Sequence, residues 1–183
     1  DEPSTIYGLL AEEILVPPDM SSVSFRIHPK ARFLNGDPVL AIDVKHSFDM
    51  LNSKFAAPAY RTSFSGVDKL VVVDERTVRF DLKDRTIDTV STVAGLAVFS
   101  HKWGLGADGK LKQFDEIISE YPITSGPYAI SLVDSGRRIE FKLRKGVMFP
   151  EKKGVMAARE LVADDVVFSH ERQIKSAKAQ RGY

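Results

Sequence analysis

The 183-residue sequence contains no cysteine, which excludes disulfide bonds and cysteine-ligated metal sites. It also has no apolar run close to the roughly 20 residues that a membrane-spanning helix requires, so we expect no membrane insertion. Its four histidines lack the spacing of metal ligands, and no Gly-x-Ser-x-Gly motif is present. These absences predict a protein that holds no metal and is not an enzyme.

Cofactor-binding motifs are equally scarce. Residues 104–109 match the pattern G-x-G-x-x-G, which binds dinucleotides when it lies between a strand and a closely following helix. Here the polar stretch 110–113 follows, and no parallel βαβ unit surrounds the motif. We therefore predict a loop at residues 104–109 and no cofactor.

Net charge is small over the whole chain, at +1, but it is unevenly distributed. Residues 137–183 hold 12 Lys and Arg against 6 Asp and Glu, a local charge of +6, which leaves −5 for the preceding residues. Four of these cations recur every three residues, at Arg172, Lys175, Lys178 and Arg181. No recognised nucleic-acid motif or group of stacking aromatics accompanies them, so we predict a solvated helix end and no nucleic-acid partner.

The most informative feature that is present is an internal repeat. Residues 23–33 return as residues 139–149, and residues 41–48 return as residues 163–170. In each copy an alternating stretch predicts a strand, a turn follows, and acidic residues open an amphipathic helix.

The pattern of the remaining chain predicts an α+β fold. Strands are expected in one antiparallel sheet with helices on one side, because the strands come in hairpins separated by short turns. The predicted strands are residues 23–28, 69–73, 77–82, 128–133 and 138–143. The predicted helices are residues 41–52, 87–99 and 114–120, and Pro58 and Tyr60 are placed in a loop.

The second copy contains the pattern basic-x-Gly-Val-x-Phe at residues 144–149, and the first copy has a variant of it that ends at Phe33. In both copies a variable turn follows, and then the pattern Ala-x-Asp-Val-x-x-Ser, at residues 41–47 and 163–169. With the Gly-Leu-Leu-Ala-Glu stretch at 8–12 and the Ser-Gly-Pro-Tyr turn at 125–128, this series resembles the extracellular solute-binding proteins of family 5. These are the oligopeptide, dipeptide and nickel receptors of ABC importers. The resemblance covers roughly residues 1–143 in the family's order.

The resemblance implies a periplasmic-binding-protein-like fold, of which this chain carries the smaller subdomain of the first lobe. It implies a peptide or related small solute and an ABC permease as partners of the full-length parent, and a periplasmic or extracellular location. Tyr60 matches a family tyrosine that lines the peptide site in the loop after the signature helix. An aromatic lid on the domain core is the alternative role for Tyr60. Trp103, the single tryptophan, is the second candidate ligand contact.

The chain also departs from the family. Leu40 and Val162 stand where relatives have a helix-capping threonine, and we expect Asp43, Asp164 and Asp165 to replace that cap in part. Relatives continue into a long second half, whereas here a second signature begins near residues 139–144.

We therefore expect a subdomain at residues 1–143 followed by an arm at residues 144–183, and a chain incomplete for ligand binding. The alternative is a rearranged or chimeric module that self-associates by segment exchange without binding solute. A homo-oligomer is expected, with residues from about 144 to 183 crossing to another subunit. His170 and Gln173 replace the apolar Phe48 and Leu51 of the first helix, so the arm is too polar to form a core alone and should order only through such contacts.

Overall fold

The computed structural model describes residues 9–117, 120–149 and 151–175, so Gly8, Lys178 and Arg181 lie outside the described residues. The chain forms two compact units, Asp1–Ser125 and Gly126–Tyr183, each of which is described by itself. The expected division into a subdomain at residues 1–143 and an arm at residues 144–183 was based on where the second signature begins in the sequence. It stays a prediction. No helix in the described part has both the length and the apolar character to cross a membrane.

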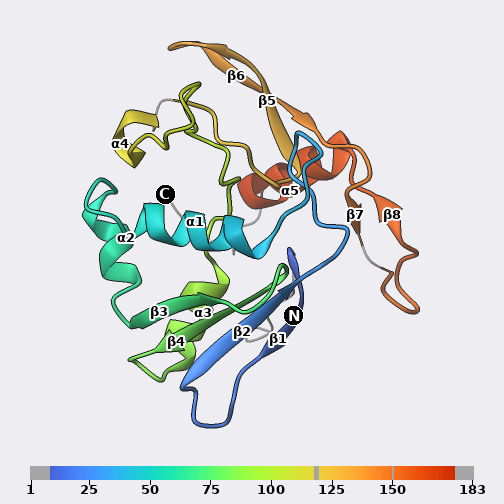
Figure 1. Cartoon of the computed structure of the whole chain (residues 1–183). Coiled ribbons are helices and arrows are strands. Elements are labelled where there is room, and N and C mark those ends of the chain that lie inside the picture. Colours follow the sequence, from blue (N-terminus) through green and yellow to red (C-terminus); the bar gives the residue numbers. More distant parts are fainter. Residues whose placement is uncertain (1–8, 118–119, 150, 176–183) are drawn as a thin grey trace. The chain divides into compact units, whose positions relative to one another are not determined.

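The first unit is built on a four-stranded antiparallel sheet (Figure 1). Its strand order is β1 (Ala11–Leu15), β2 (Ser22–Ile27), β4 (Thr77–Leu82) and β3 (Val67–Val72). Val23 lies opposite Phe80 and Phe25 opposite Val78, so the apolar members of the alternating pattern share one face. The predicted strands 23–28, 69–73 and 77–82 are confirmed within a few residues.

Helix α1 (Ala41–Leu51) buries its apolar stripe against this face. Val44, Phe48 and Leu51 are all buried, and the Phe48 ring meets Phe80 and Phe64 edge-on at 5.6 and 5.4 Å. Each such side chain contributes roughly 1.5–3 kcal/mol when fully buried. The signature helix is therefore a principal element of the core of the first unit.

Two helices differ from the predictions. Helix α3 (Ile87–Ala94) is capped by Thr86, whose hydroxyl accepts from the Thr89 N–H, but it ends before Gly95 rather than at residue 99. Glycine favours helix ends because it loses more backbone freedom than other residues in a helix interior. Helix α2 (Pro58–Ser63) replaces the loop expected there, because Pro58 occupies the first helical turn, where its missing N–H costs nothing.

The remaining elements of the first unit are short. Helix α4 (Phe114–Ile117) confirms the start of the helix predicted at 114–120, and Glu120 lies in a bend beyond it. Residues 104–109 form turns, as predicted, with Gly104 and Gly109 at positive φ. Strand β1 was not predicted, because its adjacent glutamates, Glu12 and Glu13, break the alternation of apolar and polar residues.

The second unit consists of two hairpins and a helix. Strands β5 (Tyr128–Asp134) and β6 (Arg138–Leu143) form one two-stranded sheet, and β7 (Met148–Phe149) and β8 (Arg159–Glu160) form another. Helix α5 (Ala163–Lys175) confirms the second signature helix. The prediction that strands 128–133 and 138–143 join the main sheet is wrong. Their pairing is satisfied within the hairpin, and alternation alone does not specify the sheet to which a hairpin belongs.

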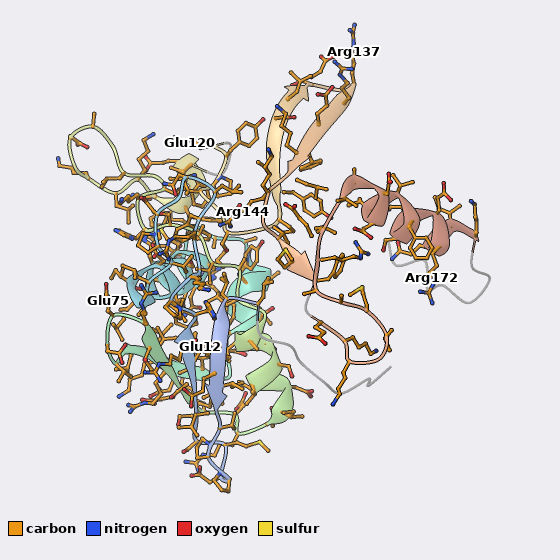
Figure 2. All side chains as sticks on the ribbon, turned by 90° about the vertical axis from the view of Figure 1, so that its right-hand side faces the viewer. Glu12, Glu75, Glu120, Arg137, Arg144 and Arg172 are labelled. Carbon is orange, nitrogen blue, oxygen red and sulfur yellow. The ribbon has the colours of Figure 1, made fainter. Side chains whose placement is uncertain are left out.

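Charge follows the division into units. The three glutamates labelled in Figure 2 belong to the first unit and the three labelled arginines to the second, with Arg137 at the tip of the β5–β6 hairpin. No described side chain of the second unit is buried, and large apolar residues such as Phe141 and Phe168 are more than half exposed. The second unit therefore has no core of its own among the described residues.

The start of α5 gives a pH-dependent prediction. Hydrogen bonds from the Arg159 guanidinium, and then from the Val162 N–H, lower the pKa of Asp165 to about 2. Because the folded pKa lies below the ordinary value of 3.8, this contact stabilises α5 fully above pH 3.8 and is lost as the pH falls towards 2. Carboxylate NMR should show Asp165 titrating near pH 2, and Arg159→Gln should return its pKa towards 3.8. Arg172→Gln is the control, and a pKa unchanged by Arg159→Gln would contradict the assignment.

Candidate functional site

The amino terminus of α1 contains the only charged side chain of the described residues that is fully buried. Asp43 is 1% exposed, and its carboxylate accepts hydrogen bonds from the N–H groups of Leu40 and His101, both at 2.8 Å. The same carboxylate lies 2.6 Å from Nδ1 of His101. The bond to Leu40 is the half of a capping box in which the third helical residue accepts from the N-cap N–H, so Asp43 replaces the missing threonine only in part, as expected.

A second signature residue contacts the same loop. The Ser47 hydroxyl lies 2.8 Å from the Asp43 carbonyl and 3.1 Å from the Phe99 carbonyl, which share its single donor, and it accepts from the Phe99 N–H at 2.9 Å. Ser47 is buried, so these bonds satisfy groups that have no access to water. Asp43 and Ser47, one turn apart on α1, therefore hold residues 99–101 through their backbone.

The turn before α1 holds the next residue of that loop. Lys102 donates to Asp37 at 2.8 Å, and this hydrogen bond is the largest cause of the lowered pKa of the Asp37 carboxyl. The loop also bonds to the segment just before the Ser-Gly-Pro-Tyr turn, since the Ser100 N–H donates to the carbonyl of Ile123. We call residues 99–103 the clamped loop. Sequence reasoning missed the bonds of Asp43 to His101 and of Ser47 to Phe99, because the paired residues lie 58 and 52 positions apart.

Trp103 ends the clamped loop and lies in an aromatic cluster. It is 7% exposed and meets the rings of Phe99 and Phe114 edge-on, at 4.8 and 6.0 Å. The imidazole of His46 also meets the Phe99 ring edge-on, at 5.7 Å. Burial is the main cause of the lowered pKa of His46. The indole Nε1 of Trp103 is buried and makes no hydrogen bond among the described residues. In this unit Trp103 is a core residue.

Tyr60 lies in a different setting. It sits on the short helix α2 and is 44% exposed. Among the described residues no ring contact or hydrogen bond joins the side chains of Tyr60 and Trp103. The structure thus presents Tyr60 at the surface and Trp103 in the interior, and it does not bring the two candidates into contact. A role in ligand binding stays a prediction for both residues.

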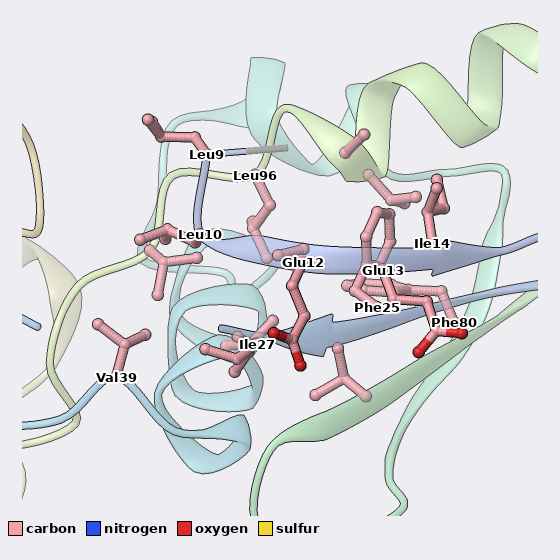
Figure 3. A pocket seen from close by; sticks show the side chains of 16 residues that line it. Leu9, Leu10, Glu12, Glu13, Ile14, Phe25, Ile27, Val39, Phe80 and Leu96 are labelled. Atoms are coloured by element: carbon pink, nitrogen blue, oxygen red, sulfur yellow. The ribbon is translucent and has the colours of Figure 1, made fainter. Parts of the chain in front are cut away.

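A pocket of about 270 Å³ lies beside β1 in the first unit (Figure 3). Its apolar lining comes from Phe25 and Ile27 of β2, Val44 of α1, and the end of α3, including Val93. Because α1 and α3 both contribute, the two helices lie on the same face of the sheet, as predicted. Of the 16 lining residues only Glu12 and Glu13 are charged.

The second copy of the signature lacks a clamped loop. Asp165 accepts from the Val162 N–H at 3.0 Å, as Asp43 does from Leu40, but its other partner is the guanidinium of Arg159. Ser169, the counterpart of Ser47, makes no side-chain hydrogen bond among the described residues. The repeat therefore reproduces the helix start and not the loop that the first helix holds.

Metal binding has no support in the described part of the chain, where no group of three or more His, Asp or Glu side chains could hold an ion. The arrangement around α1 is one of hydrogen bonds that fix the backbone, and the pocket offers an apolar surface with carboxylates. An apolar pocket with a few polar groups is the usual form of a small-molecule site.

Comparison with known proteins agrees with this chemistry. Residues 5–139 match the bacterial extracellular solute-binding proteins, family 5 (middle region). A Brucella melitensis protein whose name describes it as a binding protein is 35% identical over 143 residues, which are 78% of this chain and 22% of that protein. The "Probable peptide-binding protein YejA" of Agrobacterium fabrum is 33% identical over 147 residues, covering 79% and 24%.

Solved structures show the same fold. The oligopeptide-binding protein AppA of Bacillus subtilis, in complex with a nonapeptide, has a TM-score of 0.59 at 19% identity and covers 74% of this chain and 27% of its own. The chain belongs to the family 5 extracellular solute-binding proteins. It spans about a fifth of the length of the curated relatives that it matches.

Proposed function

We propose that this chain is part of a periplasmic or extracellular receptor that binds peptides or similar solutes for an ABC-type importer. The observation that supports this most directly is the family match over residues 5–139, on a unit whose signature helix and clamped loop are fully formed. In such a receptor two lobes close around the solute by a hinge motion and deliver it to a permease. Tyr60, exposed on α2, is the proposed solute contact from this lobe.

The chain alone is expected to bind peptides no better than about millimolar, which is only about −4 kcal/mol. The reason is that one part of a cleft leaves most of a ligand in water, and ligand sites normally cover the greater part of the ligand surface. Calorimetry with di- to pentapeptides measures this. A micromolar titration would contradict the expectation that the chain is incomplete.

A chimera tests the receptor role itself. Residues 5–139 would replace the matching segment of the Agrobacterium relative, which is 33% identical, and binding of a peptide mixture would be measured. We expect the chimera to bind the peptides that the unmodified relative binds, and Tyr60→Ala to weaken that binding more than Tyr121→Ala, a change at another exposed tyrosine. A folded chimera that binds none of these peptides would contradict the proposal.

The alternative is a structural module that self-associates. Its motivation is that no side chain is buried among the described residues of the second unit, which a contact with another copy would cover. Light scattering of the whole chain and of a chain lacking residues 144–183 separates the two functions. A dimer or larger assembly that disappears on deletion supports the module, and a monomer at high micromolar concentration argues against it.

A further inference from the structure

The β5–β6 hairpin of the second unit (Figure 1) has one face made of apolar side chains. Directly opposed residues of an antiparallel pair share a face, and residues two positions apart along a strand share it too. By this rule one face collects three opposed apolar pairs: Tyr128 with Leu143, Ile130 with Phe141, and Val133 with Ile139. Ile139 and Phe141 are 56% and 59% exposed, so this face is uncovered.

The two free edges of the hairpin differ. Among the described residues β5 and β6 form a two-stranded sheet, so each strand has one unpaired edge. Strand β5 contains a bulge, because Ser131 is an extra residue between the pairs formed by Ile130 and Leu132. A bulge bends a strand and discourages pairing with another chain. Strand β6 has no bulge and alternates strictly between charged and apolar residues over 138–143.

The backbone groups on the free edge of β6 belong to its apolar residues. The N–H of Arg144 donates to the Pro127 carbonyl at 2.8 Å, so residue 144 directs its backbone groups towards β5. Successive residues of a strand direct these groups to alternate edges, which places the N–H and C=O groups of Ile139, Phe141 and Leu143 on the free edge. Another strand can therefore pair with β6 without breaking the hairpin.

We propose that β6 pairs antiparallel with β6 of a second copy of this chain, so that Phe141 of one copy lies opposite Phe141 of the other. In this register Ile139 faces Leu143 and Glu140 faces Lys142, and each pair occurs twice because a two-fold axis relates the copies. Opposite charges that face each other across strands are stabilising. The strand is therefore complementary to itself in both charge and apolar pattern.

Other registers are less favourable. A shift of one residue sets apolar side chains against charged ones, because it moves every side chain to the other face. Pairing centred on Glu140 sets two glutamates against each other, and pairing centred on Lys142 sets two lysines against each other. Like charges directly opposite are destabilising. Only the register centred on Phe141 avoids both faults within the strand.

The size of the contact sets its strength. The pairing joins two hairpins into one four-stranded sheet with a continuous apolar face, and sheets of three or more strands are more stable than a lone hairpin. The shared edge is six residues long, and it covers far less than the roughly 800 Å² per partner of a stable complex. We therefore expect a dissociation constant on the order of 100 μM. The contact is independent of the receptor role, and it differs from segment exchange because each chain keeps its own segments.

The test follows the whole chain, labelled with ¹⁵N, by sedimentation and by amide hydrogen exchange between about 10 μM and about 1 mM. We expect a dimer at the higher concentration, with added protection of the amides of Ile139, Phe141 and Leu143. The amides of Glu140 and Lys142 should not change, because they face β5. A monomer at the higher concentration, or a dimer whose three edge amides gain no protection, would overturn the proposal.

Charge exchange tests the register. Glu140→Lys and Lys142→Glu should each raise the dissociation constant about tenfold, because each sets like charges opposite one another twice. An equimolar mixture of the two variants should associate as well as the original chain, since both Glu–Lys pairs form again between unlike copies. Arg137→Glu, an equal change of charge at the exposed tip outside β6, is the matched control for Lys142→Glu.

Two results would contradict this register. One is a mixture that associates no better than either variant alone, and the other is an equal effect of Arg137→Glu and Lys142→Glu. Either failure leaves the chimera test of the receptor role unaffected, because that test measures peptide binding.

Discussion

Replacing Asp43 with alanine is expected to lower the free energy of unfolding of the first unit by roughly 3 kcal/mol. The substitution leaves the partly buried N–H groups of Leu40 and His101 without their acceptor, and a buried group left unsatisfied costs about 1–3 kcal/mol. Urea unfolding followed by fluorescence of Trp103, which is buried in this unit, measures the loss.

The internal repeat provides a matched control for that experiment. Asp165→Ala changes the equivalent residue of α5, whose side chain is partly exposed and holds no clamped loop. We expect it to change the unfolding monitored by Trp103 by less than about 0.5 kcal/mol. If the two substitutions have equal effects, the burial of Asp43 is not what makes the signature carboxylate important.

The second large effect is expected for Phe48→His, which gives the first helix the residue found in the second copy. Phe48 is 6% exposed and contacts the rings of both Phe64 and Phe80, so its loss removes a central packing element. Truncating a buried phenylalanine costs about 3–5 kcal/mol, and a buried imidazole without a partner recovers little of this. The same fluorescence-monitored urea unfolding should show a loss of about 3 kcal/mol or more.

His170→Phe is the control for Phe48→His, because position 170 is exposed in α5. It should leave the stability of the first unit unchanged. The pair also bears on segment exchange, since α5 in the place of α1 would bury His170 and Gln173 where Phe48 and Leu51 now lie. A loss below about 1 kcal/mol for Phe48→His would show that the core tolerates the second copy, and exchange would then become feasible.

Local patterns predicted the elements that carry regular periodicity. The alternation of Val23, Phe25 and Ile27 predicted β2, and the spacing of Val44, Phe48 and Leu51 predicted α1 and its buried face. These predictions succeeded because one face of each element packs on the same core. Strand β1 escaped prediction because two adjacent glutamates and a register shift interrupt its pattern.

The candidate site was less accessible to sequence reasoning. Asp43 was singled out as a charge near the helix start, but its bonds to His101 depend on a residue 58 positions later. The pocket brings together β1, β2, α1 and the end of α3, and no short motif encodes that combination. Trp103 was chosen because it is the single tryptophan, whereas packing on Phe99 and Phe114 places it in the core.

The clamped loop has a consequence for synthesis on the ribosome. The acceptor groups on α1 are made early, and the donors at residues 99 and 101 are added more than fifty residues later. Until then the Asp43 carboxylate can accept hydrogen bonds only from water and from the start of its own helix. The amino-terminal end of α1 therefore cannot be fully buried in the core. Nascent chains that end before residue 101 should remain open to protease, and protection should begin only once the loop has left the exit tunnel.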